Sequence, residues 1–252
     1  MLSVVIITFN EERNIGRCLL SVKSVADDIV VVDSFSSDKT GEICRSAGAR
    51  FLQRTWEGYA PAKNFGAAQA KYDWILSIDA DEALSDKLAA SILSIKKSRA
   101  TPACAFNRLT NYCGKWIHHC GWYPDRKLRI YDRRKGAWEG EIHETIMLQT
   151  NEQVLRLHGD LLHYSYYTTE EHDRQIEKFS RLAAEMLYKK GEHAGLLKIW
   201  IKSISKFFKV MFIRLGFLDG YYGWVISVKS ARESWLRYTG LRNLWLHKNL
   251  SR

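Results

Sequence analysis

The sequence predicts an α/β fold, in which a mostly parallel β-sheet carries helices on both faces and is followed by a helical C-terminal region. Two patterns support this prediction. Short apolar, β-branched runs alternate with helical patterns over the first hundred residues, and amphipathic helical patterns fill the chain beyond residue 168. In addition, 46% of the 252 residues are hydrophobic, which is enough to bury a sizeable core.

The strands and helices of the first hundred residues can be assigned in order. The first strand is the run LSVVIITFN; it ends at Asn10, a predicted helix N-cap, after which Ile15, Leu19 and Val22 recur at helical spacing. Further strands are predicted over 29–32, 50–53 and 74–78, and further helices over about 38–48, over about 61–71 and from near Ser85.

Three carboxylates follow the strand that begins WILSI. Asp79, Asp81 and Glu82 lie within four residues, and packed carboxylates repel one another unless a cation or a proton relieves them. Helix capping explains one of them, which we assign to Glu82, and leaves the pair Asp79 and Asp81 unexplained. The carboxyl ends of parallel strands share one edge of the sheet, where ligands bind. Because no glycine-rich phosphate loop is present, we expect Mg²⁺ or Mn²⁺ to bridge this pair to a diphosphate.

Four segments carry a family resemblance: SVVIITFNEERNIGRCLLSV, IVVVDSFSSDKT, AKNFGAA and DWILSIDADE. In order and spacing they resemble the nucleotide-sugar-binding half of family-two inverting glycosyltransferases with the GT-A fold. The resemblance covers residues 1–100. It implies that Asp33 contacts the uracil or ribose and that Lys63 approaches the base, although Asp33 as a turn-capping residue is the alternative. The donor-binding residues it implies are Thr8, Asn10, Glu11, Asp33, Lys63 and Asp79, and the metal ligands are Asp81 and Asp79.

Residues 101–167 are expected to form the acceptor side of the same domain. An inverting transfer needs a base that takes the proton of the acceptor hydroxyl, and a carboxylate is the usual choice. The run PDRKLRIYDRRKGAWEGEIHE resembles lipopolysaccharide inner-core β-glucosyltransferases, and we favour Glu144 as the base, with Glu141 next. Asp125 and Glu139 are further candidates for the base. The alternative is a structural role, in which Glu139 and Glu141 form ion pairs with Arg133, Arg134 or Lys135 on a hairpin.

The stretch CGKWIHHC, from Cys113 to Cys120, contains two cysteines and two histidines but lacks the C-x2-C spacing typical of structural zinc sites. The nearby Trp116, Trp122 and Tyr123 are candidates either for stacking on sugar rings or for core packing. The five cysteines form no CxxC pair, which favours reduced thiols.

The last 85 residues, 168–252, are predicted to be helical and to associate with a membrane. The formal net charge of +10 lies entirely beyond residue 100, because residues 1–100 contain 13 Lys/Arg and 13 Asp/Glu. A helix starts at Thr168 or Thr169 and ends at Gly191. The next helical run carries a narrow lysine stripe beside Trp and Phe, which suits an anionic inner-membrane surface, and burial between neighbouring helices is the alternative. The stripe consists of Lys198, Lys202, Lys206 and Lys209.

Together these observations predict a metal-dependent, inverting glycosyltransferase. The resemblance implies that it moves a sugar, glucose in the related branch, from a UDP-sugar to a lipid-linked saccharide such as the inner-core heptose of lipopolysaccharide. No nucleic-acid partner is expected. In the absence of a recognisable signal peptide, we expect a cytoplasmic protein bound peripherally to the inner membrane. A haloacid-dehalogenase-like phosphatase, which also uses D-x-D after a strand, and a non-catalytic membrane adaptor are the alternatives.

Overall fold

The computed structural model describes residues 1–98, 102–140, 144–149 and 153–250. The chain divides into two compact units. The first unit contains residues 1–109 and 125–164, and the second contains residues 110–124 and 165–252. The strands are β1 Ser3–Thr8, β2 Asp28–Asp33, β3 Arg50–Gln53, β4 Trp74–Asp79, β5 Glu82–Leu84, β6 Ala103–Tyr112, β7 Lys115–Ile117, β8 Asp125–Asp132, β9 Gly136–Glu139, β10 Thr145–Leu148 and β11 Val154–Tyr166.

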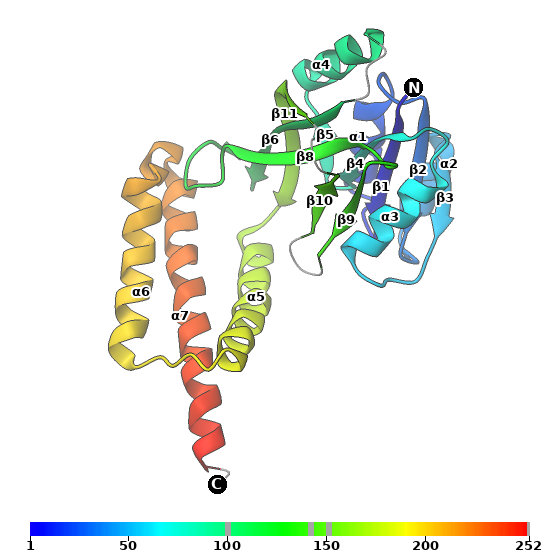
Figure 1. The fold of residues 1–252 in the computed structure, drawn as a ribbon. Coiled ribbons are helices and arrows are strands. Elements are labelled where there is room, and N and C mark those ends of the chain that lie inside the picture. Colours follow the sequence, from blue (N-terminus) through cyan, green and yellow to red (C-terminus); the bar gives the residue numbers. More distant parts are fainter. Residues whose placement is uncertain (99–101, 141–143, 150–152, 251–252) are drawn as a thin grey trace. The chain divides into compact units, whose positions relative to one another are not determined.

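The main sheet has a parallel half and an antiparallel half (Figure 1). Its strand order is β3-β2-β1-β4-β8-β6-β11-β5. Strands β1 to β4 are mutually parallel, whereas β8 runs antiparallel to both β4 and β6. The predicted α/β fold is confirmed, and its parallel part corresponds to the four strands predicted from the first hundred residues. The antiparallel strands extend this sheet with residues beyond 100.

Helices cover both faces of the parallel half. The helices of the first unit are α1 Ile15–Val22, α2 Thr40–Ser46, α3 Tyr59–Gln69 and α4 Asp86–Lys97. Helices α1, α2 and α4 share one apolar core with inward side chains of β1 and β4, whereas α3 packs with the hairpin β9–β10 on the opposite face. This two-sided burial explains why the parallel strands read as continuous apolar runs rather than alternating ones.

Helix α3 packs against the sheet at a position where only glycine fits. A Cβ atom placed on Gly66 would lie 2.4 Å from Cγ1 of Val5 and 3.0 Å from Cγ2 of Val32, so no larger side chain fits. Two residues earlier, the amide of Asn64 donates to the backbone carbonyl of Trp138 and accepts from its N–H, both at 2.9 Å. Helix α3 is therefore attached to the sheet on one side and to β9 on the other.

Two local predictions about the strand ends were wrong. Asn10 does not cap α1; it adopts a left-handed backbone with φ of 53°, and its side-chain oxygen accepts from the N–H of Ser37 at 2.8 Å. Glu82 does not begin a helix either, since it lies in strand β5 and is 1% exposed. The cap of α4 is Ser85, whose hydroxyl accepts from the N–H of Leu88. Short polar side chains compete for such positions through local hydrogen bonds.

The second unit is largely helical. It contains α5 Thr169–Lys189, α6 Leu196–Phe208, a π-helical segment η1 Lys209–Ile213, a 3₁₀ segment η2 Gly216–Asp219 and α7 Tyr221–Leu250. Thr168 caps α5 in a capping box with Glu171, as the sequence predicted, and Gly191 takes a positive φ just beyond its end. Trp122 packs edge-on against Tyr112 inside an aromatic cluster, so it serves core packing in this unit.

Asp219, for which the sequence suggested no role, organises the CGKWIHHC stretch. Its carboxylate is buried and accepts from the backbone N–H groups of His118 and His119, at 3.2 and 2.8 Å. It also lies 3.1 Å from Nδ1 of His119. Across the described ranges, no group of three or more His, Cys, Asp or Glu side chains lies together as a structural zinc site would require. The stretch therefore consists of a turn, the short strand β7 and a segment whose backbone is held by one carboxylate, and Cys120 is buried within it.

Candidate active site

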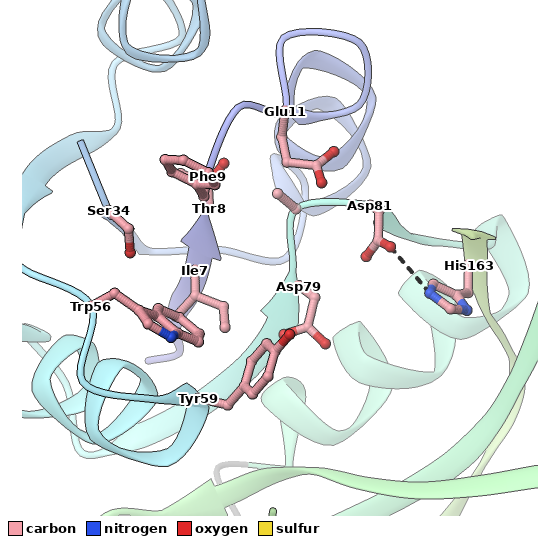
Figure 2. A pocket seen from close by; sticks show the side chains of 11 residues that line it. Ile7, Thr8, Phe9, Glu11, Ser34, Trp56, Tyr59, Asp79, Asp81 and His163 are labelled. Carbon is pink, nitrogen blue, oxygen red and sulfur yellow. Dashed lines mark hydrogen bonds and ion pairs between the residues drawn. The ribbon is translucent and has the colours of Figure 1, made fainter. Parts of the chain in front are cut away.

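A pocket of about 690 Å³ opens at the carboxyl ends of the parallel strands. The strand register places Thr8 beside Asp33 and Ile7 beside Asp79, so the polar ends of β1, β2 and β4 meet at one edge. Trp56 and Tyr59 stand at its lip, each about half exposed and packed edge-to-face at 4.8 Å (Figure 2). The lining residues are Ile7, Thr8, Phe9, Glu11, Ser34, Trp56, Tyr59, Asp79, Ala80, Asp81 and His163.

Asp81 faces a histidine that sequence reasoning missed. Strand β11 pairs with β5 so that His163 lies opposite Glu82, and its Nε2 atom is 3.1 Å from Oδ2 of Asp81 (Figure 2). The Asp81 side chain is 27% exposed and that of His163 is 15% exposed, and both line the pocket. Nothing in the local sequence around His163 signals this role, because the contact depends on strand pairing across 82 positions.

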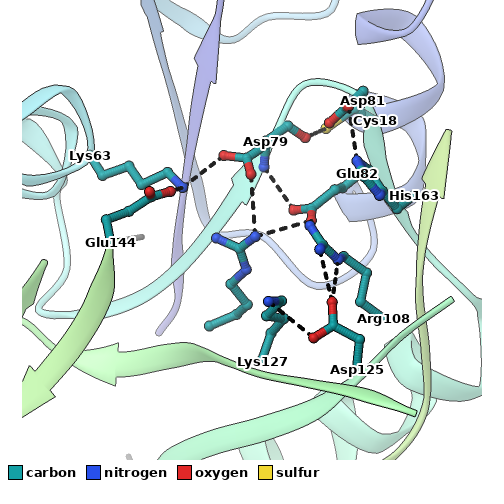
Figure 3. A network of polar contacts seen from close by, with 11 residues as sticks. Cys18, Lys63, Asp79, Asp81, Glu82, Arg108, Asp125, Lys127, Glu144 and His163 are labelled. Carbon is teal, nitrogen blue, oxygen red and sulfur yellow. Dashed lines mark hydrogen bonds and ion pairs between the residues drawn. The ribbon is translucent and has the colours of Figure 1, made fainter. Parts of the chain in front are cut away.

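Asp79 is held by two cations. The ammonium of Lys63 lies 3.0 Å from its Oδ1 (Figure 3). The guanidinium of Arg129 lies 3.2 Å from its Oδ2. Burial raises the pKa of the Asp79 carboxyl, but Lys63 and then Arg129 outweigh it and hold that pKa well below the usual range. Asp79 is therefore ionised at neutral pH.

Lys63 connects Asp79 to the favoured base. Its side chain is fully buried, and its ammonium also lies 2.9 Å from Oε1 of Glu144 and 4.3 Å from the centre of the Trp138 ring. Glu144 precedes strand β10 and its side chain is 16% exposed. The donor-side carboxylate and the candidate base thus share one lysine (Figure 3). The resemblance had implied that Lys63 approaches the nucleotide base, and the structure places its ammonium between two carboxylates.

Arg129 reaches this cluster through a β-bulge. Cys104 of β6 pairs with Ile130 of β8, but Ala105 pairs with Leu128, so Arg129 is the extra residue. A bulge re-aims the side chain of the extra residue and interrupts regular pairing. The Arg129 side chain is 5% exposed and lies 3.1 Å from Oε1 of Glu82 as well as near Asp79.

Glu82 is a positioning residue within this network. Its Oε2 accepts the backbone N–H of Asp79 at 2.9 Å, while Oε1 pairs with Arg129 and, at 3.5 Å, with Arg108. A buried carboxylate with these partners fixes the turn that carries the D-x-D pair. This role replaces the helix start that the sequence suggested.

The remaining donor candidates fall into two groups. Thr8 and Glu11 line the pocket, whereas Asn10 and Asp33 do not. The pKa of the Glu11 carboxyl is raised above its ordinary value, mainly by burial. A hydrogen bond from the Asn14 side chain opposes this shift, and the nearby Asp81 carboxylate adds to it. The carboxylate of Asp33 is buried, accepts the Ser36 backbone N–H at 2.9 Å, and therefore closes the β2–α2 turn.

The candidate bases are also separated by the structure. Glu139 is exposed on β9, opposite Thr145. Asp125 is paired with Arg108 and Lys127. Glu141 lies outside the described residues. The hairpin arginines Arg133 and Arg134 pair with Asp73 and Asp132 rather than with Glu139. Of the candidate bases in the described part of the chain, Glu144 is the one that shares Lys63 with Asp79.

An α/β sheet of this topology, with acidic side chains gathered at its parallel-strand ends, defines a GT-A-like glycosyltransferase. The family model described as Glycosyl transferase family 2 matches residues 3–152. An uncharacterized glycosyltransferase of Rickettsia bellii is 33% identical over 98% of this chain and 88% of its own length. The chain belongs to glycosyltransferase family 2. This membership favours a glycosyltransferase over the two alternatives considered from the sequence, a phosphatase and a non-catalytic adaptor.

The chain is also similar to a further curated relative and to two solved structures. The lipopolysaccharide core biosynthesis glycosyltransferase LpsC of Rhizobium meliloti is 30% identical over 87% of this chain and 82% of its own length. Among solved structures, glucosyl-3-phosphoglycerate synthase of Mycobacterium tuberculosis, in complex with Mn²⁺ and UDP, is 20% identical with a TM-score of 0.37. That match covers 44% of each chain. TarS of S. aureus is 17% identical with a TM-score of 0.44, over 87% of this chain and 44% of the TarS chain.

Proposed function

We propose that this glycosyltransferase performs a metal-dependent, inverting transfer from a UDP-sugar, of which UDP-glucose is the first candidate, to a lipid-linked saccharide. One observation carries the proposal: the pocket lined by Asp81 and His163 adjoins the Asp79–Lys63–Glu144 cluster, as expected if a donor bound in the pocket lies next to a base at Glu144. The similarity to LpsC, named for lipopolysaccharide core biosynthesis, supports a saccharide of the lipopolysaccharide core as the acceptor, of which inner-core heptose is the candidate that the sequence resemblance implies.

The residues at the pocket suit a divalent ion whose coordination is completed by the substrate. A carboxylate and an imidazole, from Asp81 and His163, face the pocket together, and both are common metal ligands. Asp79 already has two cationic partners and is better suited to orienting the donor. In the described part of the chain no third His, Cys, Asp or Glu joins them, as expected where diphosphate oxygens and water complete the shell. A bound ion would neutralise the departing diphosphate.

Glu144 acts as the base in this proposal. It accepts the proton of the acceptor hydroxyl as that oxygen attacks the anomeric carbon, and the bond from that carbon to the diphosphate breaks on the opposite side. The ion pair with Lys63 uses Oε1 of Glu144, which leaves Oε2 for the hydroxyl. Lys63 in turn fixes the position of the carboxylate relative to Asp79.

Thermal unfolding with a panel of nucleotide-sugars tests this function. Binding to the folded state raises apparent stability by about 2.7 kcal/mol at a ligand concentration 100 times the dissociation constant. We expect UDP-glucose or another UDP-sugar to raise the melting temperature with Mg²⁺ or Mn²⁺ present and to have little effect when EDTA is added. Equal stabilisation by GDP- or CMP-sugars, or no dependence on metal, would contradict the proposed donor.

A membrane surface is the second part of the proposal. None of the helices in the described ranges combines the length and apolarity that crossing a bilayer requires. Helix α6 nevertheless buries only Ile199 and Ser203, and large apolar side chains remain exposed along it and the following π-helical segment. These side chains include Leu197, Trp200, Ile201, Ile204, Phe208 and Phe212. An apolar face of this size bordered by lysines fits the interface of an anionic bilayer.

The four lysines of the stripe differ in their contacts with the rest of the chain. Lys202, Lys206 and Lys209 are exposed. Lys198 differs, because its ammonium donates to the backbone carbonyl of His193 at 2.9 Å and pairs with Glu192 at 3.4 Å. Three of the four lysines are therefore free to approach lipid headgroups.

Replacing Lys202, Lys206 and Lys209 together with Gln is expected to weaken binding to anionic liposomes by about 100-fold, since each Lys near such a surface contributes about 1 kcal/mol. Sedimentation at low and high salt measures this, because salt screens the attraction over about 10 Å at 0.1 M. Lys198→Gln is the matched control and should bind like the wild type. Equal binding of the wild type to neutral and anionic liposomes would contradict the electrostatic part of the proposal.

A further inference from the structure

We propose that a basic cleft beside Glu144 binds an anionic substituent, a phosphate or a carboxylate, of the acceptor saccharide. The proposal rests on the proposed function, because it takes the Glu144 side of the cluster as the acceptor side. The cleft, called here the β8 cleft, has a volume of about 400 Å³. Its charged lining residues are Asp79, Arg108, Arg126, Lys127, Arg129 and Glu144.

The β8 cleft adjoins the donor pocket without being part of it. Asp79 lines both, whereas Glu144 and Thr145 line only the β8 cleft. The cleft exists because β8 separates from β4: their pairing stops at Leu76 and Ile130, next to the bulge at Arg129. A molecule in this cleft would therefore lie beside the candidate base and across Asp79 from the donor.

Charge in and around the cleft is not balanced. Two cations, Arg108 and Lys127, share Asp125, at 2.8 and 3.0 Å. Arg108 also shares Glu82 with Arg129. Five cations thus meet four carboxylates: Lys63, Arg108, Arg126, Lys127 and Arg129 against Asp79, Glu82, Asp125 and Glu144.

Arg126 supplies the excess charge. It is exposed, it lines the cleft, and no ion pair to it occurs among the residues that the structure describes. Its neighbour Lys127 is 36% exposed, and its ion-pair partner in the described part of the chain is the shared Asp125. Guanidinium groups bind phosphate and carboxylate through paired hydrogen bonds. A neutral saccharide would leave the Arg126 charge without a partner, whereas an anionic substituent would match it.

Inorganic phosphate and acetate are the probes that test this inference. Binding of each to the full-length protein is measured at constant ionic strength, with and without saturating UDP and Mg²⁺, so that the donor pocket is blocked in one arm. We expect Arg126→Gln to weaken binding of the preferred anion about tenfold or more, the scale of a hydrogen bond to a charged group. Arg126→Lys should retain part of the affinity. Arg156→Gln, which changes an exposed arginine of β11, is the matched control and should bind like the wild type.

The outcomes separate the inference from the proposed function. Tighter binding of phosphate than acetate supports a phosphorylated acceptor, and the reverse supports a carboxylated one. If neither anion binds, or if Arg126→Gln binds as well as Arg156→Gln, the inference is overturned even when UDP binds normally. Failure of UDP to bind contradicts the proposed function instead, and the arm without UDP still reports whether the anion depends on Arg126.

Discussion

Replacing Asp81 with Asn is expected to abolish both metal-dependent UDP binding and sugar transfer while the fold is retained. The substitution keeps the size of the side chain and removes the negative charge that faces the pocket beside His163. Of the two proposed protein ligands, Asp81 and His163, only Asp81 is an anion. A divalent ion at this site would therefore lose its anionic ligand in the Asn variant. Isothermal titration with UDP at fixed Mn²⁺, together with a transfer assay, measures the loss.

Asp86→Asn provides the control for this prediction. Asp86 is exposed in the first turn of α4, where loss of its charge costs only a few tenths of a kcal/mol. It should therefore bind UDP and turn over like the wild type. A folded Asp81→Asn protein with near-normal activity would show that the D-x-D pair does not hold a metal. His163→Ala should weaken metal-dependent binding in the same direction.

The second large effect is expected at Glu144. Glu144→Gln should reduce the rate of transfer by about 100-fold or more, the usual scale for a general base, because an amide cannot take the proton of the acceptor hydroxyl. UDP binding should be unchanged, since Lys63 retains Asp79 as a partner at 3.0 Å.

Two variants of the same hairpin make the assignment of the base falsifiable. Glu139→Gln changes an exposed carboxylate on β9 and should leave the rate near that of the wild type. If Glu141→Gln shows the large loss and Glu144→Gln does not, the base is Glu141. Thermal unfolding of each variant separates a loss of chemistry from a loss of fold, because removing one partner of a buried ion pair also destabilises.

The parallel half of the fold was predictable because its signals are local. Buried strands read as apolar runs, and the start of helix α4 near Ser85 was predictable from the local pattern, although its cap is Ser85 and not Glu82. The pairing of β8, β6 and β11 was not predictable in this way. It depends on register between segments far apart in the sequence, which no local pattern encodes.

The candidate site was predictable to the same extent. The D-x-D pair stands out because two carboxylates at a strand end need a cation, whatever their neighbours are. Their partners were not identifiable. Lys63 meets Glu144 across 81 positions and His163 meets Asp81 across 82, and a lone lysine or histidine carries no sign of such a contact. Arg129 was hidden for another reason, since a bulge breaks the alternation on which strand predictions rest.

The close seating of α3 on the sheet has a consequence for how precisely the site is built. Three contacts fall within one helical turn of α3. Gly66 packs against Val5, Asn64 hydrogen-bonds to the backbone of Trp138, and the ammonium of Lys63 pairs with both Asp79 and Glu144. Helix α3 lies between the sheet and the β9–β10 hairpin. The close approach at Gly66 therefore sets the distance between the hairpin and the sheet. The spacing between Glu144 and Asp79 therefore depends on a glycine three residues from Lys63, at a position where even a methyl group would clash with the sheet.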